Sequence, residues 1–245
     1  MTQGSIRKVG FAGLGAVAGL SLLSFLFWLT LPRATTLVSE NPTTTAFIER
    51  YSKRLESDST LPPLRWHWAT YEDISVHVKR AAVAAEDMEF FSHSGFSHAE
   101  IAAAMREAIR DWEAPRGAST ITQQTAKNLW LSPSRNPIRK LKEFFLTRRL
   151  ERALSKSRIL EIYLNVAEYG VGIYGVNAAA EHYFGKSASA LTEHESAMLA
   201  ASLPRPTSWN PNSDSPYYLG YVDEIEYRMD QAEFLWQHVE PAHPQ

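Results

Sequence analysis

The chain has 245 residues, which leaves room for a short membrane anchor and one globular domain of ordinary size. Hydrophobic residues make up 44% of the sequence and aromatic residues 11%, which excludes a disordered chain. Cysteine is absent, so disulfide bonds, thiolate metal sites and a cysteine nucleophile are excluded, and the net charge of −2 conceals a strongly basic block.

The first predicted element is a membrane anchor, Val9–Leu31. This run carries no charge and, at ~1.5 Å per residue, is long enough to cross a ~30 Å hydrocarbon core as a helix. Arg7 and Lys8 precede it, so the positive-inside bias predicts residues 1–8 in the cytoplasm and the rest of the chain outside. A cleaved signal peptide is the alternative. The run exceeds the usual apolar region of ~7–15 residues and no A-x-A-like site follows promptly, which favours an uncleaved anchor.

The remaining sequence predicts a mainly α domain. Residues 32–60 are rich in Thr, Ser and Pro and indicate a linker, and period-2 strand patterns are scarce beyond it. Residues 212–245 form an acidic, aromatic tail to which the sequence assigns no role. The expected helices are 98–112, 119–130, 137–154, 156–167, 177–183, and one that opens at the capping box of Thr192–Glu195 and stops at Pro204.

The first candidate for chemistry is the segment Glu86–Gly95. An alanine-rich predicted helix delivers Glu86 and Asp87 to its end, and two adjacent phenylalanines and His93 follow before a glycine turn. A carboxylate beside aromatic rings is partly desolvated, which raises its pKa and makes it a better base near neutral pH. The alternative is that both acids are ordinary surface residues and that the histidine is structural.

The second candidate, Gly117–Asn128, offers hydroxyls, amides and one ammonium without a carboxylate. Ser119 and Thr120 stand at the predicted helix start, where free backbone N–H groups and the helix dipole favour an anion. This inventory suits phosphate and sugar hydroxyls, whereas the alternative is a polar surface helix. The candidate binding residues are Gly117, Ser119, Thr120, Gln123, Gln124, Lys127 and Asn128.

The third candidate lies in the basic block Arg116–Arg158, where eleven Lys or Arg residues face two carboxylates, a net charge of +9. Such a block points to phosphates, a membrane surface or nucleic acid, or else to a solvated helix face. Within it, Arg135, Arg139 and Lys140 surround Glu143. This carboxylate forms either a surface ion pair or a support for cations or a divalent metal near a pyrophosphate.

These clusters closely resemble, in order and spacing, the signature motifs of glycosyltransferase family 51, the peptidoglycan glycosyltransferases. The resemblance rests on E-D-x-x-F-x-x-H-x-G at 86–95, G-x-S-T-I-T-Q-Q-x-x-K-N at 117–128, R-K-x-x-E at 139–143 and I-L-E-x-Y-L-N at 159–165. It spans roughly residues 61–211, the predicted catalytic domain. One departure is Met88, where many members carry a basic residue, and this concerns substrate contacts rather than an expected catalytic group.

The resemblance implies a lysozyme-like α fold with a large lobe and a smaller membrane-proximal lobe. It implies polymerisation of lipid II into β-1,4-linked glycan strands, with inversion and release of undecaprenyl pyrophosphate. Glu86 would be the catalytic base, and Glu143 would support the leaving group directly or through a divalent cation (Mg or Mn), although no cofactor is predicted to be essential. Substrate binding would fall to Asp87, His93, Gly117, Ser119, Thr120, Gln123, Gln124, Lys127, Asn128, Arg135, Arg139 and Lys140.

The resemblance also predicts a location and partners. The protein would sit in the bacterial inner membrane as a single-pass protein, with its catalytic domain on the periplasmic side. It would act on lipid II and the lipid-linked strand, beside other cell-wall proteins and without nucleic acid. A transpeptidase needs S-x-x-K and K-T-G. The only S-x-x-K is Ser5–Lys8 and K-T-G is absent, which predicts a monofunctional enzyme.

Two other functions remain open from sequence. A lysozyme-like hydrolase would cut the same polymer with carboxylates, but an uncharged glycosidic bond needs no basic block. A non-catalytic scaffold would recruit other wall enzymes and would have no use for Glu86, Lys127 and Glu143 together.

Overall fold

The computed structural model of the chain describes residues 29–97, 102, 119–134 and 136–240. The chain divides into two compact units, Met1–Arg33 and Ala34–Gln245. The predicted anchor lies almost entirely outside the described residues, as do Gly117, Arg135 and nearly all of the predicted helix 98–112. Within the described part of the chain, no helix combines the length and the apolar character needed to cross a membrane.

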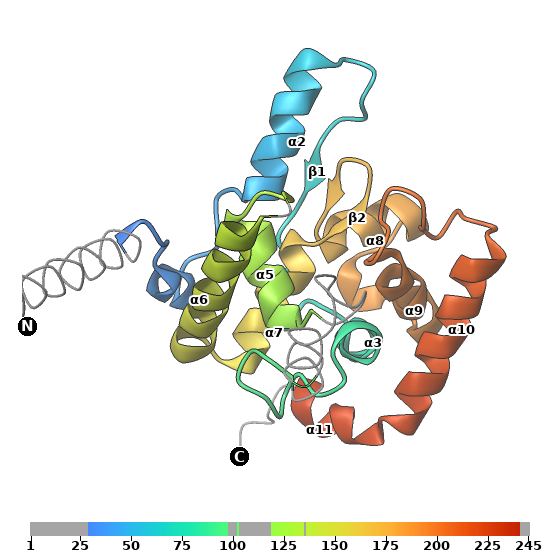
Figure 1. Cartoon of the computed structure of the whole chain (residues 1–245). Helices are drawn as coiled ribbons and strands as arrows, with labels where there is room; N and C mark the ends of the chain where they lie inside the picture. The colour runs from blue at the N-terminus through green and yellow to red at the C-terminus, as the bar shows by residue number, and fades with distance from the viewer. Residues whose placement is uncertain (1–28, 98–101, 103–118, 135, 241–245) are drawn as a thin grey trace, which may run out of the picture. The chain divides into compact units, whose positions relative to one another are not determined.

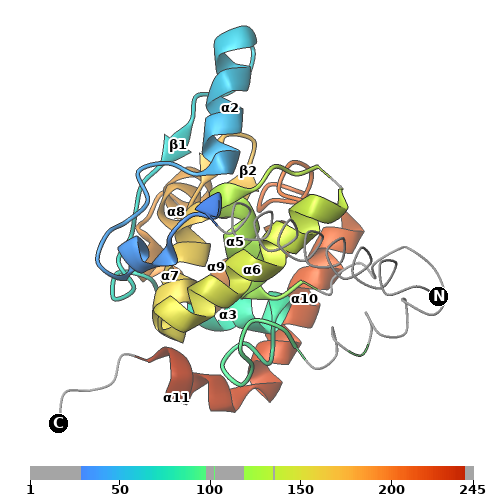
Figure 2. The same ribbon diagram turned by 60° about the vertical axis from the view of Figure 1, so that its left-hand side comes forward.

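The second unit is mainly α-helical, as the sequence predicts (Figures 1 and 2). Its described α-helices are α2 (Ala46–Ser57), α3 (Val76–Glu86), α5 (Ile121–Trp130), α6 (Pro137–Ala153), α7 (Lys156–Val166), α8 (Val176–Phe184), α9 (Glu193–Ser202), α10 (Pro216–Gln231) and α11 (Trp236–Val239). The described 3-10 helices are η1 (Ala34–Val38), η2 (Ala188–Ala190) and η3 (Glu233–Leu235), and the strands are β1 (Arg65–Trp66), β2 (Glu168–Gly170) and β3 (Ile173–Tyr174).

The helix boundaries follow the signals in the sequence. The Asn136 side chain caps α6 by accepting a hydrogen bond from the Arg139 N–H at 2.7 Å, and proline occupies the first helical position. Thr192 and Glu195 form the predicted capping box of α9. Gly185 ends α8 in the left-handed conformation, at φ +66°. These three boundaries are confirmed.

Helix α7 forms the centre of the fold. All its residues from Ile159 to Val166 are buried, so this helix is enclosed on every side rather than amphipathic. The Asn165 side chain, fully buried, accepts from the Ala69 N–H and donates to the Ala69 carbonyl, at 2.8 Å each. A single amide therefore ties the segment after β1 to the central helix.

A second core holds α3, α9 and α10 together. Small side chains on α3 and α9 let the two helix backbones approach closely, and α10 covers both with larger side chains. Its fully buried residues include Tyr218, Ile225 and Met229. Residues 216–231 of the predicted tail therefore pack into the domain as α10. The i, i+4, i+7, i+11 spacing of Tyr218, Val222, Ile225 and Met229 is the signal that marks this helix.

The predicted linker 32–60 contains two helical segments that the sequence analysis does not predict, η1 and the 12-residue helix α2. Ile48 and Tyr51 on α2 pack against Tyr174 of the small sheet. In this sheet β3 pairs with β1 in parallel and with β2 in antiparallel orientation. The strands are two or three residues long, too short to give a period-2 pattern in the sequence.

Candidate active site

Glu86 is the last residue of α3 and points toward α5. Its Oε2 accepts a hydrogen bond from the Gln124 Nε2 at 2.5 Å. Burial raises the pKa of the Glu86 carboxyl, while the Gln124 bond and the charge of Lys127 oppose the rise by stabilising the ionised form. The result is a partly buried carboxyl with a raised pKa and one fixed amide donor, the state expected of a base that works near neutral pH.

Two further hydrogen bonds fix the orientation of the Gln124 amide. Its Nε2 also donates to the Ser119 carbonyl at 3.2 Å, and its Oε1 accepts from the Tyr163 hydroxyl at 3.3 Å. Tyr163 is a buried residue of the central helix α7. The buried Tyr163 hydroxyl needs an acceptor, and Gln124 Oε1 is that acceptor. The amide oxygen therefore faces Tyr163, and the amide N–H₂ group faces Glu86.

Replacing Gln124 by methionine should shift the pH profile of the enzyme to higher pH. A base at Glu86 would be active when ionised, so kcat/KM is expected to fall as the pH drops through the raised pKa of this carboxyl. Loss of the amide donor removes a bond to the ionised form, which raises this pKa further and moves the acidic limb upward. Titration of kcat/KM against pH for both proteins measures the shift; an acidic limb at the same pH would contradict it.

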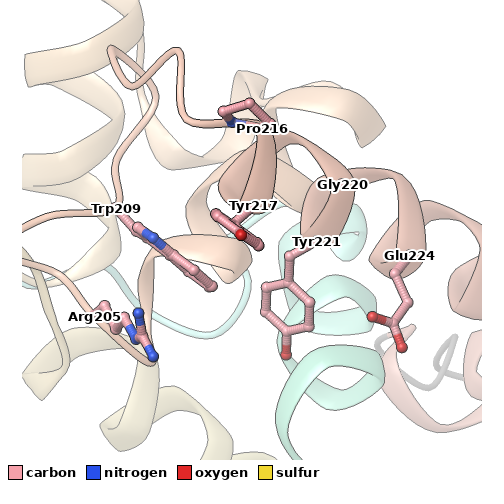
Figure 3. A pocket seen from close by; sticks show the side chains of 7 residues that line it. All are labelled: Arg205, Trp209, Pro216, Tyr217, Gly220, Tyr221 and Glu224. Carbon is pink, nitrogen blue, oxygen red and sulfur yellow. The ribbon is translucent and has the colours of Figure 1, made fainter.

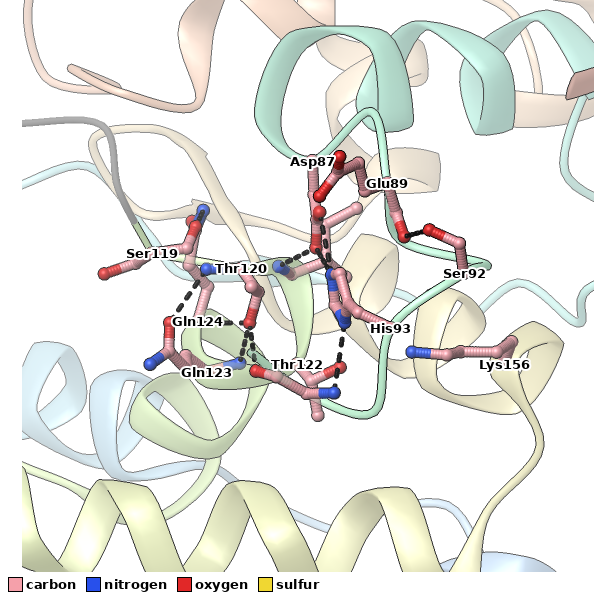
Figure 4. A network of polar contacts seen from close by, with 12 residues as sticks. Asp87, Glu89, Ser92, His93, Ser119, Thr120, Thr122, Gln123, Gln124 and Lys156 are labelled. Carbon is pink, nitrogen blue, oxygen red and sulfur yellow. Dashed lines mark hydrogen bonds and ion pairs between the residues drawn. The ribbon is translucent and has the colours of Figure 1, made fainter. Parts of the chain in front are cut away.

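Asp87 and His93 form a buried hub directly after α3 (Figure 4). The His93 Nδ1 accepts from the Gly95 N–H at 3.0 Å, so the proton sits on Nε2, which lies 2.9 and 3.0 Å from the two Asp87 oxygens. Asp87 Oδ2 also accepts from the Ile121 N–H at 3.0 Å, at the start of α5. One carboxylate therefore joins the end of α3, the following loop and the beginning of α5.

Gly95 closes the loop against two other helices. Its φ is +95°, and a Cβ at this position would lie 2.8 Å from Thr147 Cγ2 on α6. Its carbonyl accepts from the Thr120 hydroxyl at 2.8 Å. A residue with a side chain would have to adopt a rare backbone conformation and displace α6, which is the physical reason for glycine in the motif.

Truncation of Asp87 to alanine should destabilise the fold by about 3 kcal/mol, because it leaves the His93 Nε2–H and the Ile121 N–H buried without acceptors. Urea unfolding followed by circular dichroism measures the loss. Glu89→Ala is the matched control, since Glu89 is an exposed carboxylate in the same loop. Equal unfolding midpoints for the two variants would show that the hub contributes nothing to stability.

The start of α5 holds an anion, as its sequence indicates, but the anion is a protein group. Thr120 and Gln123 form a capping box, in which the Thr120 N–H donates to Gln123 Oε1 at 2.9 Å and the Gln123 N–H donates to Thr120 Oγ1 at 3.3 Å. The Ile121 N–H is taken by Asp87. These three N–H groups are therefore already satisfied inside the protein.

The predicted cationic side chains of the site lie on α5 and α6. Lys127 is on α5, one turn after Gln124, and makes no hydrogen bond or ion pair with the residues the structure describes. Burial lowers the pKa of Lys127, whereas the charges of Glu143 and Glu86 raise it. The charges of both predicted carboxylates therefore act on this one ammonium.

Glu143 lies on α6 with its side chain buried. Its Oε2 accepts from the Arg139 Nη1 at 2.6 Å and its Oε1 from the Lys140 Nζ at 2.5 Å. Each oxygen of the Glu143 carboxylate thus accepts a hydrogen bond from a cation. Because this carboxylate is buried, the ion pair differs from the exposed surface pair that is one of the two sequence interpretations. The Arg139 Nε is buried and has no hydrogen-bond partner among the described residues.

The structure therefore gathers most of the predicted site residues in two connected groups. Around Glu86 and the cations it places Ser119, Gln124, Lys127, Arg139, Lys140 and Glu143. In the buried hub it places Asp87, His93, Thr120 and Gln123, and Asn128 is buried on α5. Gly117 and Arg135 lie outside the described residues.

Sequence reasoning missed two supports. The motifs in the sequence assign no role in the site to Tyr163 or to Glu151. The Glu151 Oε1 accepts from the Thr122 hydroxyl at 2.6 Å and from the Lys156 Nζ at 2.8 Å, and so joins α5, α6 and the start of α7. Its one signal was that it is the second carboxylate of a block otherwise made of Lys and Arg.

Comparison with known proteins gives a consistent result. The family model described as Transglycosylase matches residues 58–230. Proteins named biosynthetic peptidoglycan transglycosylase are similar over most of their length. The one from Nitrosospira multiformis is 45% identical over 78% of this chain and 84% of its own length. The one from Shewanella frigidimarina is 49% identical over 78% of this chain and 80% of its own length. The relative from Methylobacillus flagellatus is 39% identical over 93% of this chain and 99% of its own.

Proposed function

This chain belongs to the transglycosylase family and is a peptidoglycan glycosyltransferase, and from this premise we propose that Glu86 is its catalytic base and that lipid II is its substrate. The observation that carries the proposal is the arrangement around Lys127. The charges of Glu86, a carboxyl of raised pKa, and of Glu143, a carboxylate paired with two cations, both act on this one ammonium.

In the proposed reaction Glu86 and Glu143 have different roles. Glu86 removes the proton from the acceptor sugar 4-hydroxyl, whose oxygen attacks the anomeric carbon of the lipid-linked strand. The bond from this carbon to the diphosphate breaks, and the new β-1,4 bond forms with inversion. A carboxyl with a raised pKa suits the first step because its conjugate acid is weak enough to form near neutral pH.

The departing undecaprenyl pyrophosphate would be stabilised by cations that are fixed before the reaction begins. Lys127 and Arg139 each have donors that no described residue satisfies, and Lys140 lies beside them. Arg135 is proposed to join them on sequence grounds. Preorganised cations aimed at a developing negative charge lower the barrier more than mobile ones, because they need no reorganisation during the step.

Glu143 is proposed as an electrostatic support that orients these cations. The sequence also suggested it as a ligand for a divalent metal. Both oxygens already accept from Arg139 and Lys140, and the described residues contain no group of three His, Cys, Asp or Glu side chains that could hold a metal ion. A hard divalent cation prefers a shell of several oxygens, which these residues do not supply, so no step is assigned to a metal.

Asp87, His93, Thr120 and Gln123 are proposed to position the site rather than to bind substrate. Each is buried, and the hydrogen bonds described above are made to other parts of the protein. Together they hold α3 against α5, which sets the contact between Glu86 and Gln124. Gly117, Ser119, Gln124 and Asn128 remain proposed residues of the substrate cleft.

The lipid substrate implies work at a membrane, and α6 supports this part of the proposal. Four apolar side chains on this one helix are exposed, namely Ile138, Leu141, Phe144 and Phe145. Basic residues interleave with them along α6, a pattern that suits contact with an anionic lipid surface. The anchor at Val9–Leu31, an inner-membrane location and a periplasmic catalytic domain are proposed with it.

Polymerisation of lipid II by the purified full-length protein in detergent tests the function. The product is separated by gel electrophoresis and digested with a muramidase to confirm its β-1,4 bonds. Finished glycan, supplied in parallel, distinguishes the rival hydrolase, which would shorten glycan and leave lipid II unchanged. Strand formation excludes a scaffold without activity. The same assay with a chelator decides whether a divalent cation takes part.

A further inference from the structure

The guanidinium of Arg158, in the first turn of α7, holds a segment that lies 117 to 121 residues earlier in the chain. Its Nε donates to the Leu37 carbonyl at 2.9 Å. Its Nη2 donates to the Glu40 carbonyl at 3.0 Å and to Asn41 Oδ1 at 2.7 Å. One side chain therefore fastens residues 37–41, called here the post-anchor segment, to the central helix.

The arginine is itself held in one orientation. Its Nη1 donates to Glu161 Oε1 at 2.7 Å, and the same oxygen accepts from the Trp68 Nε1 at 3.1 Å. The guanidinium also lies 5.5 Å from the centre of the Trp68 ring. The side chains of Arg158 and Glu161 are only 16% and 11% exposed. Because this ion pair is largely removed from water, the remaining guanidinium donors keep a fixed direction toward the post-anchor segment.

The post-anchor segment overlaps η1, which packs against α6 (Figures 1 and 2). Ala34 and Leu37 of η1 are buried, at 3% and 6% exposure. Helix α6 also carries the exposed apolar side chains that are proposed to face lipid. Only residues 32–33 separate η1 from Leu31, the end of the predicted anchor. The chain is thus fixed to the domain almost immediately after that anchor.

Without these bonds the next fixed point along the chain is the start of α2. There Thr45, 1% exposed, accepts from the Ile48 N–H at 3.1 Å. A five-residue 3-10 helix such as η1 is not stable alone, so its packing depends on contacts like those of Arg158. The tether after the anchor would then lengthen from residues 32–33 to residues 32–44. Effective concentration falls roughly as the −3/2 power of tether length, which corresponds to a loss of about tenfold.

We propose that Arg158 is a positioning residue that sets the length of the tether between the membrane anchor and the catalytic domain. A short tether keeps the site at the surface in which the lipid-linked substrate moves. The inference rests on the proposed function, because the anchor and the lipid substrate both belong to it. Arg158 acts through the post-anchor segment and not on the reacting atoms. Its effect should therefore appear with substrate embedded in a bilayer and not with substrate free in solution.

The first test compares Arg158→Met with Arg205→Met in the full-length protein. Arg205 is the matched control, since its guanidinium also lies beside a tryptophan, 5.0 Å from the Trp209 ring, and forms no ion pair or hydrogen bond with the described residues (Figure 3). Each protein is assayed in vesicles of phosphatidylethanolamine and phosphatidylglycerol that contain lipid II. The parallel assay, in detergent, uses a water-soluble lipid II analogue with a short prenyl chain.

Arg158→Met should raise KM for lipid II in vesicles about tenfold and leave kcat and the rate on the soluble analogue within about twofold of the unchanged enzyme. Arg205→Met should change neither assay. An equal loss in both assays would make Arg158 a general structural residue and would overturn the proposal.

A pair of insertions tests the tether with Arg158 in place, and so does not depend on how the substitution folds. About ten glycine and serine residues between Pro32 and Arg33 lengthen the tether and should raise KM in vesicles about tenfold. The same insertion between Pro42 and Thr43 follows the post-anchor segment and should leave KM unchanged. Equal KM values for the two insertions would contradict a tether that ends at this segment.

Proteolysis separates failure of this inference from failure of the proposed function. A glutamyl endopeptidase cuts after Glu40, an exposed residue whose carbonyl Arg158 holds. Arg158→Met should speed this cleavage about tenfold, because a bond must leave its folded contacts before it enters a protease. Unaltered cleavage would show that Arg158 does not fasten the segment. If the unchanged enzyme made no strands in either assay, the proposed function would fail while this result still stood.

The two kinds of measurement together decide the role. Faster cleavage with an unchanged KM in vesicles would show that the segment is fastened without setting the tether, and this too would overturn the proposal. Faster cleavage with a raised KM in vesicles alone is the expected result.

Discussion

Glu86→Gln is expected to reduce strand synthesis from lipid II by about 10²–10⁴-fold, the contribution typical of a general base. Glutamine has nearly the same size and can still contact the Gln124 amide, but it cannot take a proton from the acceptor hydroxyl. The turnover number in the polymerisation assay should carry the loss, while KM for lipid II changes little. This pattern identifies an interaction that matters in the transition state rather than in substrate binding.

The matched control is Glu89→Gln, which removes an exposed carboxylate three residues along the chain. It should synthesise strands at the rate of the unchanged enzyme, and both variants should give the same far-UV circular dichroism. If Glu86→Gln were as active as this control, Glu86 could not be the base, and the assignment of roles around Lys127 would fall with it.

Lys127→Met is expected to lower kcat by about 10²–10³-fold, comparable to the loss of one preorganised donor at a site of developing charge. Methionine fills a similar volume without the ammonium, so the packing of α5 should persist. A second effect distinguishes this role from a structural one. The charge of Lys127 lowers the pKa of Glu86, so its removal should raise this pKa and move the acidic limb of the pH profile upward.

Lys53→Met on α2 is the control, because its side chain is an exposed ammonium that takes no part in the proposed site. Measurements of kcat and KM across pH separate the outcomes. A rise in KM alone, with an unmoved acidic limb, would make Lys127 a residue of ground-state binding and would remove it from the stabilisation of the leaving group.

The parts of the fold that sequence predicts well are those set by local signals. The start of α6 at Asn136–Pro137, the capping box of α9 and the glycine after α8 depend on residues within one turn of the helix end. Four short motifs carry the proposed site residues in a fixed order, and the charges of Glu86 on α3 and Glu143 on α6 both act on Lys127 of α5.

The parts that sequence missed depend on contacts between distant segments. The role of Tyr163 follows only from its hydrogen bond to Gln124, 39 residues away, because the phenol looks like any other core residue of α7. The Ile121 N–H at the start of α5 donates to Asp87, which lies 34 residues earlier in the chain, so this N–H group is already satisfied within the protein. Helix α2 was missed for a local reason, since its many charged and polar residues resemble those of a linker although Ile48 and Tyr51 mark a buried face.

Helix α10 has a consequence for the timing of activity. The last carbonyls of α3 have no partners within their own helix, and α10 supplies them, through Tyr221 to Ala85 and Arg228 to Ala84. These donors lie more than 130 residues downstream of the carbonyls that they satisfy. A growing chain that reaches only as far as α9 would therefore hold every motif residue and still lack the two donors at the end of α3, so Glu86 is held in place only once α10 has folded.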